Sequence, residues 1–319
     1  MLYSVFLIVL GLILLIVGAE YAVRGSVAIA NKLKIPMIIV GLTVVALGTS
    51  LPEFVVSVKA ALTGSAGISI GNVVGSNIAN VLLILGGAAL FYPIKCRRRI
   101  FLKNYKFLFL VNIIFVVFAL TGKFVSWQGV IMLLLLMAFI YHNYKNANKT
   151  AVSEDSLSPI ANKNWFYVIA VTVAGLATIM YGADFLVEGA CNIAKIFGVS
   201  NEVIGLTIVA VGTSLPELAT TIVAALKKQN DVALGNIIGS NIWNIVFIMG
   251  FTSVVTDVKV TMQFIYYDIW VMFLSTVLLY PVMMTKARMS RFEGAVFVTV
   301  YALYLLSQVM ITKGYWNFG

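Results

Sequence analysis

Two glutamates, Glu53 and Glu217, each end the same thirteen-residue motif inside a long apolar segment. Residues 41–53 read GLTVVALGTSLPE and residues 205–217 read GLTIVAVGTSLPE, so eleven of the 13 positions are identical. A carboxylate within a membrane-crossing segment is costly and is retained mainly where it binds something. The alternative, a structural pair with a nearby cation, is disfavoured because the acid occurs twice with no Lys or Arg at similar depth. The pattern therefore predicts that both glutamates bind a cation.

The residues before each glutamate are expected to break a helix. Glycine loosens the backbone, and Pro52 and Pro216 have no backbone N–H and clash with the preceding turn. The breaks should free backbone carbonyls near Ala46, Thr49, Ala210 and Thr213. The same motifs supply four hydroxyl groups, those of Thr49, Ser50, Thr213 and Ser214.

A second motif also occurs twice, as GNVVGSNIAN at 71–80 and GNIIGSNIWN at 235–244. Its side-chain oxygens come from Ser76, Asn77, Asn80, Ser240, Asn241 and Asn244. Positions four apart share one helical face, which groups Ser76 with Asn80. Two carboxylates with hydroxyl, amide and carbonyl oxygens, and no His or Cys, suit hard cations. The set favours Ca²⁺ and Na⁺ over Mg²⁺, which prefers to keep its water ligands.

Both motif pairs are separated by the same 164 residues, which indicates an internal duplication. The chain is 61% hydrophobic and only 11% charged, and its mean hydropathy is +1.01. These values exclude a soluble domain of this size and predict a polytopic protein of the lipid bilayer. The net charge of +10 does not indicate nucleic-acid binding, because the placement of Lys and Arg follows membrane topology.

Ten apolar segments are long enough to cross about 30 Å of hydrocarbon. The expected spans are 3–23, 36–62, 67–92, 105–121, 125–142, 165–187, 201–226, 231–256, 266–284 and 292–311. The predicted fold is all-α, with ten transmembrane helices of which the second and seventh are broken. A polar linker, 143–163, separates a first five-helix repeat, 1–142, from a second, 164–319.

The basic residues predict the orientation. Seventeen of the 22 Lys and Arg fall on one side of this topology, and five fall on the other: Lys59, Lys123, Lys195, Lys259 and Lys313. The positive-inside rule then places the linker in the cytoplasm and both termini outside. Because each repeat has an odd number of spans, the two repeats are inverted, an arrangement that gives a midplane site with two access states.

The paired motifs, GTSLPE followed by GN(V/I)(V/I)GSN, resemble the repeats of the Na⁺/Ca²⁺ exchangers of the cation/Ca²⁺ antiporter superfamily. The resemblance covers essentially the whole chain and implies exchange of Ca²⁺ for Na⁺ by alternating access. Glu53 and Glu217 match the central ligands of both ions, and Asn80 matches a polar central position. Thr49 and Thr213 match positions that offer carbonyls to Ca²⁺. The positions that line flanking Na⁺ sites are matched by Ser50, Ser214, Ser76, Ser240, Ala46 and Ala210.

One position departs from the family pattern. Many relatives have Asp where this chain has Asn244, and the K⁺-dependent branch resembles the Asp pattern, so Asn244 argues against K⁺ coupling. With both asparagines neutral, one Ca²⁺ or two Na⁺ would balance Glu53 and Glu217. A third Na⁺ would leave one positive charge. The repeated hydroxyl and carbonyl donors offer more than two positions of Na⁺ size, so electrogenic exchange is expected.

The sequence thus predicts a Ca²⁺/Na⁺ antiporter of the plasma (inner) membrane that is not an enzyme, has no cofactor and requires no obligate protein partner. An H⁺/Ca²⁺ antiporter of the same superfamily, in which Glu53 or Glu217 exchanges protons, is the main alternative. A cation channel is a more distant alternative, because inverted repeats with a midplane site favour a carrier.

Overall fold

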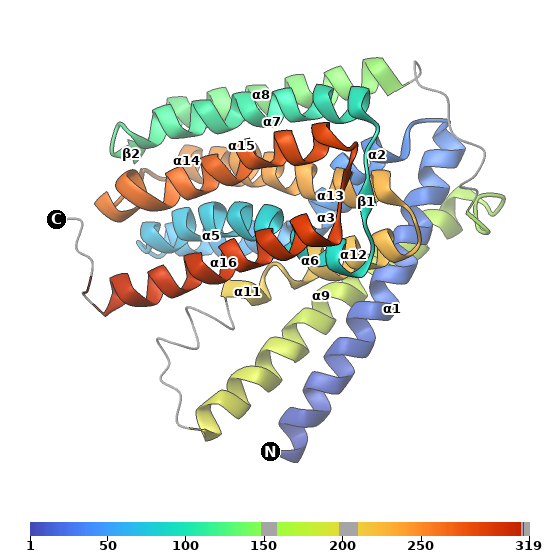
Figure 1. The fold of residues 1–319 in the computed structure, drawn as a ribbon, viewed down its shortest axis with the longest axis horizontal. Coiled ribbons are helices and arrows are strands. Elements are labelled where there is room, and N and C mark those ends of the chain that lie inside the picture. Colours follow the sequence, from blue (N-terminus) through green and yellow to red (C-terminus); the bar gives the residue numbers. More distant parts are fainter. Residues whose placement is uncertain (148–157, 198–209, 314, 316–319) are drawn as a thin grey trace. The chain divides into compact units, whose positions relative to one another are not determined.

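A computed structural model describes residues 1–147, 158–197, 210–313 and 315 (Figure 1). The contacts divide the chain into two compact units: unit 1 is Met1–Pro52 with Asn143–Gly239, and unit 2 is Glu53–His142 with Ser240–Gly319. Each unit thus combines stretches from both predicted repeats. The repeat boundaries at 1–142, 143–163 and 164–319 remain a prediction about sequence ancestry, separate from this division by contacts.

Unit 1 is built on two long helices, α1 (Leu2–Leu33) and α9 (Trp165–Ile196). Its other elements are α2 (Met37–Val40), the π-helical turn η1 (Gly41–Val45), α3 (Ala46–Thr49), α11 (Ala210–Gly212), α12 (Leu215–Leu226) and most of α13 (Asn230–Ile242). An apolar core that includes Val27, Val40, Val168 and Ala224 joins α1, α2, α9 and α12.

The helices α1 and α9 pack closely along matching glycines (Figure 1). A Cβ atom added at Gly182 would lie 2.8 Å from the Leu15 backbone nitrogen and 2.9 Å from the Gly11 carbonyl oxygen. One added at Gly18 would lie 2.8 Å from the Gly175 carbonyl oxygen. Gly11 therefore faces Gly182 and Gly18 faces Gly175, so the two helices are antiparallel. Only glycine permits this backbone approach.

The helix α1 continues ten residues beyond the predicted end at residue 23. Its polar residues stay helical because Glu20 forms ion pairs with Arg24, one turn later, and with Lys227, whose Nζ lies 2.6 Å from Oε1. The helix ends at Lys34, which adopts a left-handed conformation (φ 55°), just before Pro36. Charged residues at this end therefore belong to the helix and do not mark its boundary.

Unit 2 contains the remaining helices of the described residues. They are α4 (Leu51–Leu62, from Glu53 onward), α5 (Ala66–Ala79), α6 (Gly86–Phe91), α7 (Arg98–Ala119), α8 (Ser126–Ala147, to His142), α14 (Gly250–Val255), α15 (Ile269–Thr285) and α16 (Arg291–Thr312). Three π-helical turns extend them: η2 (Asn80–Leu85), η5 (Trp243–Met249) and η6 (Phe264–Asp268). The helix α16 packs on α6 and η2, and α15 packs on α5 and α7.

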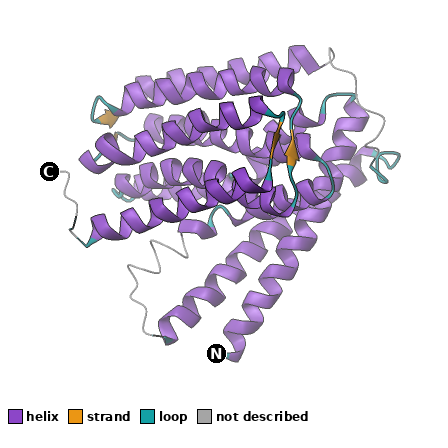
Figure 2. Cartoon of the chain, in the orientation of Figure 1, coloured by secondary structure: helices purple, strands orange, loops and turns teal. Residues whose placement is uncertain are grey.

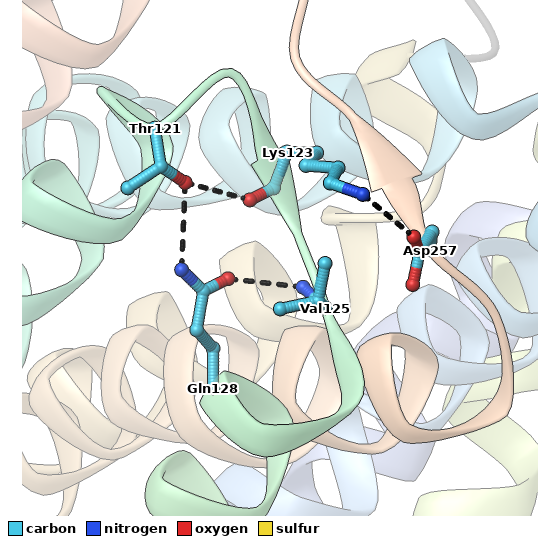
Figure 3. Close-up of polar contacts among 5 residues, drawn as sticks. All are labelled: Thr121, Lys123, Val125, Gln128 and Asp257. Atoms are coloured by element: carbon cyan, nitrogen blue, oxygen red, sulfur yellow. Dashed lines mark hydrogen bonds and ion pairs between the residues drawn. The ribbon is translucent and has the colours of Figure 1, made fainter.

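Two small antiparallel ribbons in unit 2 add strand pairing to the predicted all-α fold (Figure 2). The strand β1 (Ile94–Lys95) pairs with β4 (Arg288–Met289), and β2 (Lys123–Phe124) pairs with β3 (Val258–Lys259). At the second ribbon Lys123 Nζ lies 3.3 Å from Asp257 Oδ2, and Gln128 Oε1 accepts the Val125 N–H at 2.9 Å (Figure 3). Hydrogen bonding between distant connections explains strands that no sequence period signals.

Eight helices in the described residues are long and apolar enough to cross a membrane, and Met37–Thr49 with Leu51–Leu62 would make nine as one span. The all-helical membrane fold is thus confirmed. Each predicted span contains described helix, although residues 201–209 of the seventh lie outside the described residues. The π-helical turns were not predicted, because these segments are apolar on nearly every side, so the rotation caused by an inserted residue is not visible in the apolar run.

Candidate functional site

Unit 1 brings three of the predicted site residues together around a buried carboxylate. Glu217 lies in the first turn of α12 and is 1% exposed, and Ser50 Oγ donates a hydrogen bond to its Oε1 at 3.0 Å. Thr49, also buried, donates to Asn236 Oδ1 at 3.3 Å. The first turn of a helix favours a carboxylate, because its backbone N–H groups and the helix dipole face it. A negative charge, a hydroxyl and an amide thus converge at the helix break.

The break between α3 and α4 falls at Ser50, among the residues before Glu53 that were expected to break the helix. The carbonyl of Ala46 was predicted to be free, and the structure corrects this. That oxygen accepts the Ser50 backbone N–H at 3.0 Å and the Thr49 hydroxyl at 3.4 Å. The proline does not release it, because the missing N–H of Pro52 would have bonded four residues back, at Gly48.

Unit 2 holds the other carboxylate and a row of buried amides. Glu53 is 1% exposed in the first turn of α4. Asn80 Nδ2 donates to Asn241 Oδ1 at 2.9 Å. The Asn80 Oδ1 atom and both side-chain atoms of Asn244 are buried without a hydrogen-bond partner among the described residues. Buried polar atoms are normally satisfied, so these amides are suited to a polar or ionic ligand.

Asn80 and Asn244 lie in the first turns of η2 and η5, respectively. A π-helical turn is frequent at functional sites because it redirects side chains within a helix. Ser76 and Ser240 are buried one turn earlier, and Ser214 is buried beside the α12 start. Thr213 is half-buried, and Ala210 is the first described residue of α11.

Sequence reasoning missed a pair of asparagines that anchor the two glutamates. Asn72 Nδ2 donates to the Glu53 carbonyl oxygen at 2.9 Å and to Ser57 Oγ at 2.8 Å. At the 164-residue offset, Asn236 Nδ2 donates to the Glu217 carbonyl oxygen at 3.5 Å and to Thr221 Oγ1 at 3.0 Å. The repeated Gly-Asn pair of the second motif was the signal that could have found them.

Aromatic packing supports the Glu53 half of this arrangement. The ring of Phe54 stacks on Phe247 with centroids 4.8 Å apart and meets Phe251 edge-on at 5.2 Å. Trp243 packs edge-on against Phe247 and is 6% exposed, so it belongs to the core. These rings hold the residue beside Glu53 and limit rotation of the first turn of α4.

Small residues allow close packing of the second motif. A Cβ added at Gly239 would lie 2.7 Å from the Leu42 carbonyl oxygen, and one at Gly235 would lie 2.6 Å from the Ile38 carbonyl oxygen. The helix α13 thus lies directly against α2 and η1. At Gly75 no described atom lies within 4 Å of an added Cβ.

We expect Asn72→Ala to lower the apparent affinity of the site for a bound cation by about fivefold to thirtyfold. A lost hydrogen bond that leaves a buried group unsatisfied costs on the order of 1–2 kcal/mol. Ser57→Ala is the matched control, since Ser57 bonds Asn72 and not the Glu53 carbonyl, and it should change the affinity less than about threefold. Equal effects of the two variants would show that Asn72 does not act through Glu53.

Apolar membrane-length helices, buried carboxylates at helix starts and neighbouring hydroxyl and amide oxygens define a class of membrane protein that handles hard cations. In the described residues, no group of three or more His, Cys, Asp or Glu side chains is placed to hold a metal ion. Residues 3–145 and 167–310 match the sodium/calcium exchanger protein family, and the chain belongs to this family, within the cation/Ca²⁺ antiporter superfamily.

Individual relatives agree. The chain is 36% identical over 318 residues to the putative antiporter CaxA of Alkalimonas amylolytica, covering 95% of this chain and 98% of that protein. It is 32% identical over 338 residues to the sodium/calcium exchanger MaX1 of Methanosarcina acetivorans, covering 94% and 97%. The structure of the sodium-calcium exchanger NCX_Mj soaked with 10 mM Na⁺ and zero Ca²⁺ matches with a TM-score of 0.84 and 32% identity, over 96% of this chain and 99% of that chain.

Proposed function

We propose that the chain is a secondary active antiporter that exchanges Ca²⁺ for Na⁺ by alternating access across the cell membrane. One observation carries this proposal: a buried carboxylate occurs at equivalent helix starts in the two repeats, and an equivalent asparagine holds each. The proposed ligands of the transported ions are Glu53, Glu217, Thr49, Thr213, Ser50, Ser214, Asn80, Asn244, Ser76, Ser240 and Ala210. Ala46 is left out, because its carbonyl oxygen already accepts two hydrogen bonds. Ca²⁺ and Na⁺ share the carboxylates of Glu53 and Glu217, so occupancy by one excludes the other.

The sharing of ligands gives obligatory exchange. An empty site would expose two negative charges to the low dielectric of the bilayer, which disfavours the transition between access states. Binding of cations neutralises the carboxylates and lets the transition occur. The carrier therefore moves Ca²⁺ in one direction only when Na⁺ returns in the other.

The experiment that tests the proposal is ⁴⁵Ca uptake into proteoliposomes with and without an outward Na⁺ gradient. We expect uptake only with the gradient, and faster uptake when the interior is positive, since exit of three Na⁺ for one Ca²⁺ moves one charge outward. Uptake that instead follows an imposed pH gradient, independently of Na⁺, would identify an H⁺/Ca²⁺ antiporter. Flux without saturable counterflow would identify a channel.

The proposal includes ten spans arranged as inverted repeats. The hydrogen-bonded strands β2 and β3 must lie on the same membrane face, so an even number of crossings separates them. The helix α8, the helix α9 and the α13–η5–α14 helix supply three. The fourth crossing is assigned to the predicted span 201–226, of which the structure describes 210–226, and it completes the proposed set of ten. Antiparallel packing of α1 and α9, which are equivalent at the 164-residue offset, supports the inversion.

Topology has its own test. In a background without Cys96 and Cys191, Asn162→Cys should react only with a membrane-permeant thiol reagent in intact cells. Thr63→Cys should react with an impermeant reagent, because its connection is predicted to be external. Both positions are exposed, so access to solvent does not limit the comparison. The reverse pattern would invert the proposed orientation.

We also propose that transport is independent of K⁺, because Asn244 is neutral. Asn244→Asp adds a third carboxylate to the proposed ligands, and a bound proton or K⁺ would be needed to balance it. We expect this variant to gain a K⁺ or pH dependence at clamped membrane potential. Asn112→Asp, a buried asparagine of α7 outside the motifs, is the control. A native protein that already requires K⁺ would contradict the assignment.

A further inference from the structure

Asp268 is a buried carboxylate that the exchange motifs do not include. It ends the π-helical turn η6 in unit 2 and is 1% exposed. At the 164-residue offset the first repeat has Asn104, which is also buried but bonds the Ile100 carbonyl of its own helix. The carboxylate is therefore specific to the second repeat and breaks the symmetry of the transporter.

Three neutral donors surround this carboxylate. Its Oδ1 accepts from Tyr304 Oη at 3.0 Å and from Gln308 Nε2 at 2.6 Å, and its Oδ2 accepts from Gln263 Nε2 at 3.0 Å. It forms no ion pair with any Lys, Arg or His that the structure describes. Its hydrogen bonds are satisfied, but no cationic side chain balances its charge.

The backbone is shaped to build this cluster. In a π-helix, residues five apart align, so η6 places Gln263 and Asp268 on one side of the turn. On α16, Tyr304 and Gln308 are four apart and share a face. The Gln263 Nε2 atom also donates to Gln308 Oε1 at 2.9 Å, so a further hydrogen bond joins the start of η6 to α16.

In the part of the chain that the structure describes, the titratable groups that face Asp268 are tyrosines. Tyr267, on its own turn, hydrogen-bonds Ser307 at 2.7 Å and not Asp268, and Tyr304 and the neighbouring Tyr301 come from α16. The helix α5 and the turn η2, which pack against α15, carry no titratable side chain. The basic residues of α7 lie toward the opposite end of α15, where Arg98 binds the Thr285 carbonyl.

We propose that Asp268 is a proton-binding site, separate from the ion-exchange carboxylates. A buried charge without a cation is costly, and uptake of a proton from water removes that charge. Half-buried Gln263 and Gln308 lie at the rim of the cluster, where α16 approaches its end and η6 begins. A proton on Oδ2 removes the acceptor for Gln263, which keeps its bond to Gln308.

Phe264 connects the Gln263–Asp268 hydrogen bond to the exchange site. Phe264, the next residue, packs on Gly71, where an added Cβ would lie 3.4 Å from its Cζ atom. Gly71 precedes Asn72, which holds the Glu53 carbonyl. This step rests on the proposed function: protonation of Asp268 slows exchange because it displaces the contact between Phe264 and Gly71.

The proton site is tested without transport, by infrared difference spectroscopy of the purified protein in saturating Ca²⁺ between high and low pH. Bound Ca²⁺ keeps its own carboxylate ligands ionised, so a protonated-carboxyl C=O band at low pH reports other acids. We expect a band that Asp268→Asn removes. Tyr304→Phe removes one hydrogen-bond donor to the ionised Asp268 carboxylate. The midpoint of the Asp268 band should therefore move up by about one to two pH units. Tyr267→Phe, the matched control, should leave it unchanged.

The effect of Asp268 protonation on exchange is tested by measuring Ca²⁺ flux at saturating Ca²⁺ and Na⁺ as a function of pH on each membrane face. We expect the wild type to slow at low pH on one face, and Asp268→Asn to be slow and insensitive to pH on that face. Identical protonated-carboxyl bands in the wild type and in Asp268→Asn would overturn the proton site. A wild-type flux profile in that variant would overturn the coupling. The infrared result stands whichever ions the carrier exchanges.

Discussion

Glu217→Gln and Glu53→Gln are each expected to abolish Na⁺-driven Ca²⁺ flux while the protein still inserts and folds. Glutamine has the same shape, and at position 217 its Oε1 can still accept the Ser50 hydroxyl hydrogen bond. It carries no charge, however, and a divalent cation in a low-dielectric site loses several kcal/mol when one of two carboxylates is neutralised. An affinity loss of that size removes transport at ordinary Ca²⁺ concentrations.

Glu188→Gln is the matched control for this pair of variants. Glu188 is exposed on α9, so its replacement should leave the flux unchanged and should change the free energy of unfolding by less than about 0.5 kcal/mol. Flux is compared at equal protein in proteoliposomes, with size-exclusion profiles to establish folding. Flux near the wild-type level in either Glu53→Gln or Glu217→Gln would remove the carboxylates from the mechanism.

Gly182→Leu is expected to prevent stable assembly of unit 1, and Gly182→Ala to lower the free energy of unfolding by about 1–3 kcal/mol. The reason is geometric: any side chain at this position meets the backbone of α1 at Leu15 and Gly11, which cannot move aside like a flexible side chain. The measurement is thermal unfolding in detergent, followed by flux in proteoliposomes. Both the unfolding temperature and the flux should be lower than in the wild type.

Gly87→Ala separates this steric effect from the general effect of adding a methyl group to a helix. Gly87 lies in α6 with no described atom within 4 Å of an added Cβ, so the variant should be neutral or stabilising. If Gly182→Leu unfolded at the wild-type temperature, the close α1–α9 contact would not exist in the membrane.

Much of the fold could be predicted because the duplication and the apolar runs are strong signals. The offset of 164 residues pairs the two motifs, and each predicted span corresponds to described helix. Helix ends were less predictable. The helix α7 begins at Arg98, seven residues before the predicted start, since its charged first turns remain helical outside the apolar run. Short strands depend on tertiary pairing, which local sequence does not encode.

The candidate site was predictable where residue type and repetition coincide, as at Glu53 and Glu217. The anchoring role of Asn72 and Asn236 was not, because it depends on which carbonyl faces each amide after folding. Asp268 was missed because it occurs once, in an aromatic run at the start of a span. Its burial follows from a π-helical turn and from α16, and neither can be inferred from the residues around it.

The most direct test of the central claim is the Na⁺ gradient at which net Ca²⁺ flux stops in proteoliposomes, measured at several clamped membrane potentials. For exchange of three Na⁺ for one Ca²⁺, this null point should shift with potential as one net charge requires, about 2.3 kcal/mol per 100 mV. It should not move when K⁺ or pH is changed equally on both sides. A null point set by the pH gradient, or one that Na⁺ does not affect, would contradict Na⁺-coupled Ca²⁺ exchange.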